Sequence, residues 1–317
     1  MKRLGIAGLC ALALVLAAVP TLARTYVVSI TQIVEHPSLD AMRLGFIDTL
    51  KALGVDATFH EHIAQGNPAV NSQIASQMLG EKPDLVLAIT TPSAQAAAQK
   101  IKDIPVLFSA VSDPLGAGLV ASLDAPGGNV TGMTDKSPVD RQLELMREIQ
   151  PGLKTLGVIY NAGEANSVSQ LELLKAEAKK RGIDTVEATV TNSSGVYQAA
   201  KSLAGKCDAV YIPLDNTVVS ALESAIKVCT ENKLPLFSSD NDSVPRGTIA
   251  AVAIDYGRMG GQTAVMAKRI LVDGEKPAAM PVEQLQDLEV VVNKKAAADM
   301  GVVVPESVLK KADKVIE

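Results

Sequence analysis

Tryptophan is absent from this 317-residue sequence, and its aromatic residues are only five tyrosines and four phenylalanines. A buried core must therefore be built mainly from Ala, Val, Leu and Ile. Sugar ligands commonly stack on large aromatic rings, so the scarcity of such rings argues mildly against a sugar site. Phe108, Tyr160 and Phe237 remain as residues that could stack on a ligand.

Sequence motifs of catalysis are missing as well. The chain has no G-x-S-x-G, no Walker loop, no G-x-G-x-x-G after the first predicted strand and no H-E-x-x-H. His60-Glu61-His62 offers two histidines from one strand, whereas zinc sites use three or four protein ligands, so a solvated edge is the preferred interpretation. Cys207 and Cys229 have no paired histidine, which disfavours a thiol nucleophile. We therefore predict no enzymatic activity, no cofactor and no metal site.

The first 23 residues are typical of a secretory signal peptide. Lys2 and Arg3 precede an apolar run over residues 4–18, and small residues lead up to Ala23. The run is shorter than the roughly 20 residues that a membrane span needs. We predict cleavage after Ala23 and a soluble, periplasmic mature chain.

The remainder of the chain is acidic and poor in cysteine. Residues 24–317 number 294, enough for two domains, and carry 28 basic against 35 acidic side chains, a net charge of −7. No basic stripe indicates a nucleic-acid partner. Cys207 and Cys229 are expected at the same level of a strand and the helix after it, so a single disulfide and two free thiols both stay open.

Short apolar runs alternate with amphipathic stretches, a pattern that predicts an α/β fold with parallel sheets flanked by helices. Helical spacing appears over 139–149 and again at Val218, Leu222, Ala225 and Cys229. The runs that predict buried strands are Tyr26–Ile30, Leu85–Ile89, Val106–Phe108, Leu156–Tyr160, Ala209–Ile212 and Leu234–Phe237.

Two segments of the chain resemble each other and indicate two lobes. Residues 84–113 and 208–242 both run from Asp through an apolar strand, a polar turn and an Ala-rich helix to Leu-Phe-Ser and an acidic turn. Without gaps, Thr91-Pro92-Ser93 falls on Asp215-Asn216-Thr217; the alternative is a similarity that any two β-α-β units share. The predicted division is a signal peptide over 1–23, lobe 1 over 24–135 with a return of the chain near 255–285, and lobe 2 over 136–254 with part of 286–317.

Polar side chains follow nearly every predicted strand, where ligands of open α/β sheets bind. Each of these residues is also an ordinary helix cap, so only their number favours a site. Thr91 and Ser93 open a helix whose N–H groups attract a carboxylate. Asp215 and Asp240, in the other half, could hold an ammonium group. The pattern therefore predicts a zwitterionic ligand between the lobes.

Several ordered motifs resemble the ABC-transporter substrate-binding proteins of the tryptophan/tyrosine-binding kind, which have the type I periplasmic binding fold. The matching segments are ITQIVEHPSLDAMRLGF (30–46), AQGNP (64–68), TTPSAQ (90–95), VSDPLGAGLV (111–120), GNVTGMTD (128–135), YNAGEANSV (160–168), DNTVVSAL (215–222) and AIDYGRMGGQTA (253–264).

The resemblance implies a two-lobed, monomeric receptor that closes on an aromatic amino acid and delivers it to an ABC permease in the inner membrane. A sensory protein of the same fold, or a receptor for another small polar solute, is the alternative. The residues expected at the cleft are Thr31, Gln32, Glu35, His36, Thr91, Ser93, Ala94, Ser112, Asp113, Asn161, Glu164, Asn166, Ser167, Asp215, Asn216 and Asp240.

Overall fold

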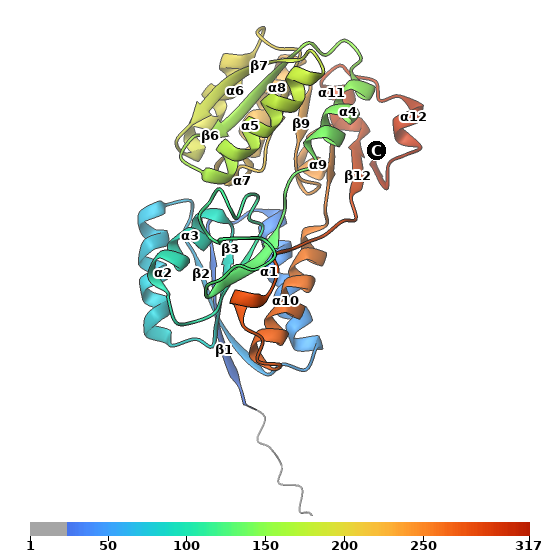
Figure 1. Ribbon diagram of the computed structural model, residues 1–317. Coiled ribbons are helices and arrows are strands. Elements are labelled where there is room, and N and C mark those ends of the chain that lie inside the picture. The colour runs from blue at the N-terminus through green and yellow to red at the C-terminus, as the bar shows by residue number, and fades with distance from the viewer. Residues whose placement is uncertain (1–23) are drawn as a thin grey trace, which may run out of the picture.

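A computed structural model describes residues 24–317 of the chain, so the predicted signal peptide over 1–23 lies outside the described residues. Two bodies of helices and strands lie one above the other (Figure 1). Their parallel sheets are flanked by helices, and the predicted α/β class is confirmed. Within 24–317, no helix is long and apolar enough to cross a membrane.

Lobe 1 is built on a six-stranded sheet in the order β11-β5-β4-β3-β1-β2, and every neighbouring pair in it is parallel. Its central strand β3 is buried along its whole length because helices cover both faces. The strands are β1 (Tyr26–Gln32), β2 (Ala57–Ile63), β3 (Leu85–Ile89), β4 (Val106–Ser109), β5 (Val130–Thr134) and β11 (Glu283–Gln284). The helices are α1 (Pro37–Ala52), α2 (Pro68–Glu81), α3 (Thr91–Lys100), α10 (Tyr256–Leu271) and the 3-10 turn η2 (Pro277–Ala279).

Lobe 2 holds a parallel four-stranded sheet in the order β7-β6-β8-β9 and a three-stranded sheet in the order β10-β12-β13. The strands β10 and β12 are antiparallel, a pairing that the sequence pattern did not predict. The strands are β6 (Thr155–Asn161), β7 (Asp184–Val190), β8 (Ala209–Ile212), β9 (Leu236–Ser238), β10 (Ala250–Ala253), β12 (Glu289–Asn293) and β13 (Lys314–Ile316). The helices are α4 (Val139–Ile149), α5 (Ala165–Lys180), η1 (Ser193–Gly195), α6 (Val196–Leu203), α7 (Asn216–Ser220), α8 (Leu222–Glu231), α9 (Ser243–Arg246), α11 (Lys294–Asp299) and α12 (Glu306–Leu309).

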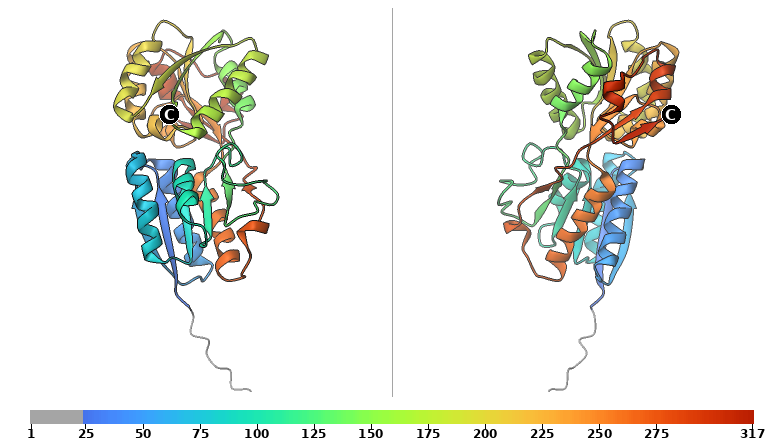
Figure 2. Two further views of the ribbon diagram at one scale, coloured as in Figure 1. Left: turned by 60° about the vertical axis from the view of Figure 1, so that its left-hand side comes forward. Right: turned by 90° about the vertical axis from the view of Figure 1, so that its right-hand side faces the viewer.

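The chain passes between the lobes three times, after β5, after β10 and after β11 (Figure 2). One apolar core gathers residues from 28–133 and 254–280, and the other gathers residues from 139–250 and 292–308. This distribution is consistent with the predicted division, whose boundaries stay a prediction. Tyr256, at the start of α10, donates from its hydroxyl to the carboxylate of Asp135 after β5, at 2.9 Å. Two of the three crossing segments are therefore tied together.

One predicted helix is broken in two. The helical spacing at Val218, Leu222, Ala225 and Cys229 predicts a single helix, and all four side chains are fully buried. The structure interrupts it at Ala221, which separates α7 from α8. All four side chains lie in the apolar core of lobe 2, so the periodic burial survives the break, and spacing alone does not reveal it.

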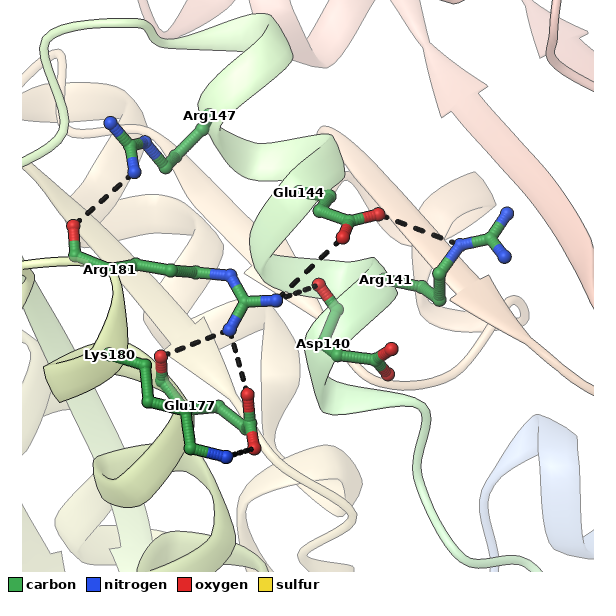
Figure 3. A network of polar contacts seen from close by, with 7 residues as sticks. All are labelled: Asp140, Arg141, Glu144, Arg147, Glu177, Lys180 and Arg181. Atoms are coloured by element: carbon green, nitrogen blue, oxygen red, sulfur yellow. Dashed lines mark hydrogen bonds and ion pairs between the residues drawn. The ribbon is translucent and has the colours of Figure 1, made fainter.

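A polar network holds α5 against α4 at the surface of lobe 2 (Figure 3). The guanidinium group of Arg181, just after α5, donates to the carboxylate of Glu177 at 2.8 Å and lies 3.7 Å from Glu144 of α4. The side chain of Arg147 donates to the carbonyl oxygen of Arg181 at 3.3 Å. Such surface pairs contribute little each, so they orient the end of α5 rather than stabilise the core.

Lobe 1 is completed by a close crossing of α1 and α10 that depends on glycine. A Cβ atom placed on Gly260 would overlap the carbonyl oxygen of Met42, and one placed on Gly45 would overlap the carbonyl oxygen of Gly257. The two backbones are therefore in direct contact. This contact fixes the late return of the chain into lobe 1.

Gly260→Ala should destabilise the protein by roughly 1–3 kcal/mol, because an added methyl group would push α10 away from α1. Gly80→Ala is the matched control, since Gly80 lies in α2 with open space around its Cα. That change should stabilise the protein by about 0.5–1 kcal/mol, the difference in helix propensity. Urea denaturation of both variants measures the difference, and equal effects would contradict the close crossing.

Candidate functional site

A cleft of about 1060 Å³ separates the lobes at the carboxyl ends of their parallel strands. We call it the outer cleft. The loop after β1, the loop after β2 and helix α3 form its lobe 1 wall, and the ends of β6 and β7 with α7 form its lobe 2 wall. Side chains that line it include Glu35, Gln65, Asn71, Gln95, Asn161, Glu164, Asn216 and Thr217.

A second, narrow cavity lies where both lobes meet near the crossing segments. Its volume is about 20 Å³, room for about one water molecule. We call it the inner cavity. Asn216 lines both spaces, so the two adjoin. Polar side chains dominate its wall: His36, Ser38, Thr90, Ser112, Asp135, Asn166, Asp215, Asn216, Asp240 and Tyr256.

The lobes are in contact in this structure. The hydroxyl of Thr90 donates to Asn216 Oδ1 at 3.2 Å, at the first turns of α3 and α7. The hydroxyl of Ser38 donates to Asp240 at 3.0 Å, and that of Ser169 donates to Asp113 at 3.0 Å. Each bond joins one lobe to the other and so holds the two walls of the cleft together.

Asp215 lines the inner cavity from the lobe 2 side and is 1 % exposed. One carboxylate oxygen caps α7 by accepting from Val218 N at 2.8 Å. The other accepts from the backbone N–H of Asn161 and from the hydroxyl of Ser167 at 2.7 Å. Burial, with the nearby charge of Glu164, raises the pKa of Asp215 to about 7. The carboxylate is thus both a structural acceptor and a group whose charge a cation would stabilise.

Glu164 supports the same helix from the other side. Its carboxylate accepts from the backbone N–H groups of Asn216 and Thr217 at 3.2 and 3.0 Å. Free N–H groups at a helix start attract carboxylates, so this pairing is the expected one. Together, Glu164 and Asp215 fix α7 and aim Asn216 at Thr90 across the cleft.

Two more carboxylates line the inner cavity. Asp135 accepts from Ser112 and Tyr256, both at 2.9 Å, and burial raises its pKa. Asp240 accepts from Ser38 of lobe 1 and from the backbone and hydroxyl of Ser243. The hydrogen-bond partners of these carboxylates are neutral side chains and backbone groups, and no lysine or arginine of residues 24–317 lines the cavity.

Four predicted site residues carry buried polar atoms without a hydrogen-bond partner in the described chain. Buried polar groups in native proteins are normally paired, so such atoms point to a missing partner. They are Thr31 Oγ1, His36 Nδ1, Thr91 Oγ1 and Asn166 Oδ1. His36 and Asn166 line the inner cavity.

Other predicted site residues are engaged within their own lobe. Gln32 bonds Val34, Asp40 and Arg43. The N–H of Ala94 donates to the carbonyl of Thr90 at 2.8 Å.

The remaining partners of predicted residues lie close to the cleft. Ser93 donates to Asn71 at 3.2 Å, and Asn161 donates to Thr217 at 2.8 Å. Glu35 accepts from Gln65 at 3.3 Å at the rim of the outer cleft. These contacts shape the wall of the cleft.

Sequence reasoning missed Asp135, Tyr256 and Ser38. All three lie in segments that carried the family resemblance, which was the available signal. Asp135 and Tyr256 lie on crossing segments and Ser38 lies at the start of α1. None of them follows a predicted strand, so a search for polar residues at strand ends does not find them. The ungapped repeat was also offset by one residue: Thr90, and not Thr91, matches Asp215, since each precedes the first residue of its helix.

The two remaining sequence hypotheses concern cysteine and metal. Cys207 and Cys229 are free thiols, so the bridge that the sequence left open is not formed. The thiol of Cys207 instead donates to the carbonyl of Leu203 at 3.5 Å. Burial raises the pKa of Cys207 to about 11 and that of Cys229 to about 12, which keeps both protonated. Among residues 24–317 there is no group of three or more metal-ligating side chains suited to a metal ion, and His60 and His62 pair with Glu81.

The two-lobed sheet architecture with a polar cleft is matched by a known family. The profile of the family described as ABC transporter substrate binding protein matches residues 27–316. The chain belongs to this family. A tyrosine-binding protein from Clostridioides difficile is 42 % identical over 270 residues, which are 84 % of this chain and 78 % of that protein.

Two solved structures bear on the conformation of this family member. The ABC domain of a Streptococcus pneumoniae protein in complex with L-Trp is 36 % identical, has a TM-score of 0.88 and aligns over 91 % of this chain and 100 % of that one. A ligand-free, open substrate-binding protein from Clostridium difficile is 40 % identical but has a TM-score of 0.69, over 92 % of this chain and 99 % of that one. The lower score at similar identity agrees with lobes that are closed here, as the three interlobe hydrogen bonds indicate.

The buried His36 should make the stability of this protein depend on pH. Burial, with the charge of Arg246, lowers the pKa of His36 to about 3, against about 6.5 in the unfolded chain. The unfolded state therefore binds one more proton between these values, and the contribution of neutral His36 is lost as the pH falls below about 6.5. Asp215 acts in the opposite sense, because its raised pKa penalises the folded state only as the pH rises from about 4 to 7.

A difference between variants separates the two effects. Relative to His36→Gln, which does not titrate, the wild type should lose roughly 2 kcal/mol of unfolding free energy between pH 7 and pH 5. Urea denaturation of both proteins at the two pH values measures this loss. A constant difference would show that His36 titrates normally in the folded state.

Proposed function

We propose that this chain is the periplasmic receptor of an ABC importer and that it binds an aromatic amino acid by closure of its lobes. The cleft carries the proposal. The outer cleft borders both lobes and has a volume of about 1060 Å³. The adjoining inner cavity is lined by buried carboxylates and by buried polar atoms that have no partner. A ligand that supplies those partners favours the closed arrangement, because they face each other only there.

The relatives support the ligand class. One is named a tyrosine-binding protein and another was solved with L-Trp, and both cover most of this chain. The polar lining of the cleft fits the charged ends of an amino acid, and its apolar part, with Ile33, Pro68 and Leu119, suits an aromatic ring. In this proposal the chain is exported by its signal peptide, acts as a monomer, performs no catalysis and hands its ligand to a permease.

We propose the same orientation for the ligand as the sequence predicts. The ammonium group would lie near Asp215, and the carboxylate would lie near the first turn of α3 with Thr91 and Ser93. Pro92 of this turn lines the outer cleft, and Asn216 beside Asp215 contacts Thr90 directly, which supports this placement.

Asp215→Asn should weaken the binding of the amino acid at least about tenfold, equivalent to 1.4 kcal/mol, because it removes the charge that faces the ammonium group. It should also lower the stability of the ligand-free protein by roughly 1–3 kcal/mol, since an amide NH₂ would face one of the donors that Asp215 now accepts. Asn can cap a helix as Asp does, but one oxygen cannot also replace the acceptor that Asn161 and Ser167 share.

Asp208→Asn is the control for this change. Asp208 accepts from the backbone N–H groups of Lys154 and Thr155 with a single oxygen, at the opposite end of β8, and an amide oxygen can replace it. Calorimetric titration of the wild type and both variants with L-tyrosine, L-tryptophan and L-phenylalanine tests the proposal. If none of the three binds the wild type, the ligand class is wrong; unchanged affinity in Asp215→Asn would leave Asp215 as a helix cap.

A further inference from the structure

The ionisable side chains that line the inner cavity include several acids and no lysine or arginine of the described residues. Asp135, Asp215 and Asp240 line it, and no lysine or arginine of residues 24–317 does. His36 also lines it, and its lowered pKa keeps it neutral at ordinary pH. A buried carboxylate is costly unless it is hydrogen-bonded or paired with a cation. Arg246, whose charge acts on His36, donates to Glu223 and does not line the cavity, so the described lining supplies hydrogen bonds but no cation.

The outer cleft is also lined by more acidic than basic side chains. Glu35 and Glu164 line it, and the only lysine or arginine in its described wall is Lys102. The ammonium group of Lys102 donates to the carbonyl oxygen of Ala98, one turn back in α3. No cationic side chain of this wall therefore faces Asp215 or the first turn of α3.

Two independent atoms mark the inner cavity as a ligand contact. His36 is 9 % exposed and Asn166 is 4 % exposed. Both line the cavity, and His36 Nδ1 and Asn166 Oδ1 have no partner in the described chain. The cavity is about 20 Å³, space for one water-sized group. An ammonium group has that size, and Asn216 connects it to the outer cleft, where the rest of a ligand would lie.

The position proposed for the ligand carboxylate offers weaker electrostatic attraction than the position proposed for the ammonium group. Pro92 has no N–H, and the N–H of Ala94 already donates to Thr90, so the first turn of α3 offers the N–H groups of Thr91 and Ser93. The hydroxyl of Ser93 is bonded to Asn71. A ligand carboxylate would meet neutral donors only, whereas an ammonium group would meet the carboxyl oxygens of three aspartates and would favour the charged form of Asp215.

We propose that the site selects its ligand by the ammonium group, and that aromatic primary amines without a carboxylate form a second class of ligand. This inference rests on the proposed function for the position of the aromatic ring. It differs from that function in assigning the greater part of the selectivity to the amine and not to the complete zwitterion.

Three ligands that share one ring separate the two contributions in calorimetric titration of the wild-type protein. L-Tyrosine carries both charged groups, tyramine lacks the carboxylate, and 3-(4-hydroxyphenyl)propionate lacks the amine. Tyramine should bind within about tenfold of L-tyrosine, and the deaminated acid should bind at least about a hundredfold more weakly than L-tyrosine. The inference is overturned if the deaminated acid binds as tightly as tyramine, or if L-tyrosine binds and tyramine does not.

The variants give a second readout. In Asp215→Asn, the preference for tyramine over the deaminated acid should fall at least about tenfold, whereas Asp208→Asn should keep it. An unchanged preference in Asp215→Asn would count against an ammonium group at this carboxylate. Binding of tyramine without binding of any aromatic amino acid would refute the proposed function and leave the amine selectivity standing. Binding of neither class would refute both.

Discussion

The carboxylate of Asp215 is the contact on which the lobe 2 side of the cleft depends. It joins the end of β6 through the N–H of Asn161, the first turn of α5 through Ser167 and the start of α7 through Val218. The first two belong to the β6–α5 connection and the third follows β8, so a shared buried acceptor holds two neighbouring strand ends in one geometry. Burial raises the pKa of this carboxyl and the three donors lower it, so the same bonds position the helix and reduce the cost of the charge.

Closure of the lobes places this buried charge against lobe 1. Thr90 then meets Asn216, Ser38 meets Asp240, and the unpartnered atoms of His36 and Asn166 face one small space. Closure without a ligand removes water from these groups without supplying their partners. In the proposed function, a bound group that supplies these partners shifts the lobes toward the closed form, because a ligand moves such an equilibrium only through contacts that differ between the two states.

The crossing segments carry their own constraint. Backbone contact between α1 and α10 is available only because Gly45 and Gly260 lack side chains, and it anchors the returning chain in lobe 1. Tyr256 begins that helix and bonds Asp135 on another crossing segment. Both residues also line the inner cavity, so the crossing segments form part of its wall.

The sequence by itself determined the α/β class, the alternation of strands and helices, and the residue types at the strand ends, because burial periodicity and capping preferences are local. Family motifs added further candidate residues for the cleft. The tertiary structure decided which of those polar groups remain free: Gln32 and Ala94 are used within lobe 1, whereas Thr91 and Asn166 keep an unpartnered atom. It also brought Asp135, Tyr256 and Ser38 into the site and left Cys207 and Cys229 unbridged. Hydrogen-bond partners come from residues distant in sequence, and only the folded chain brings them together.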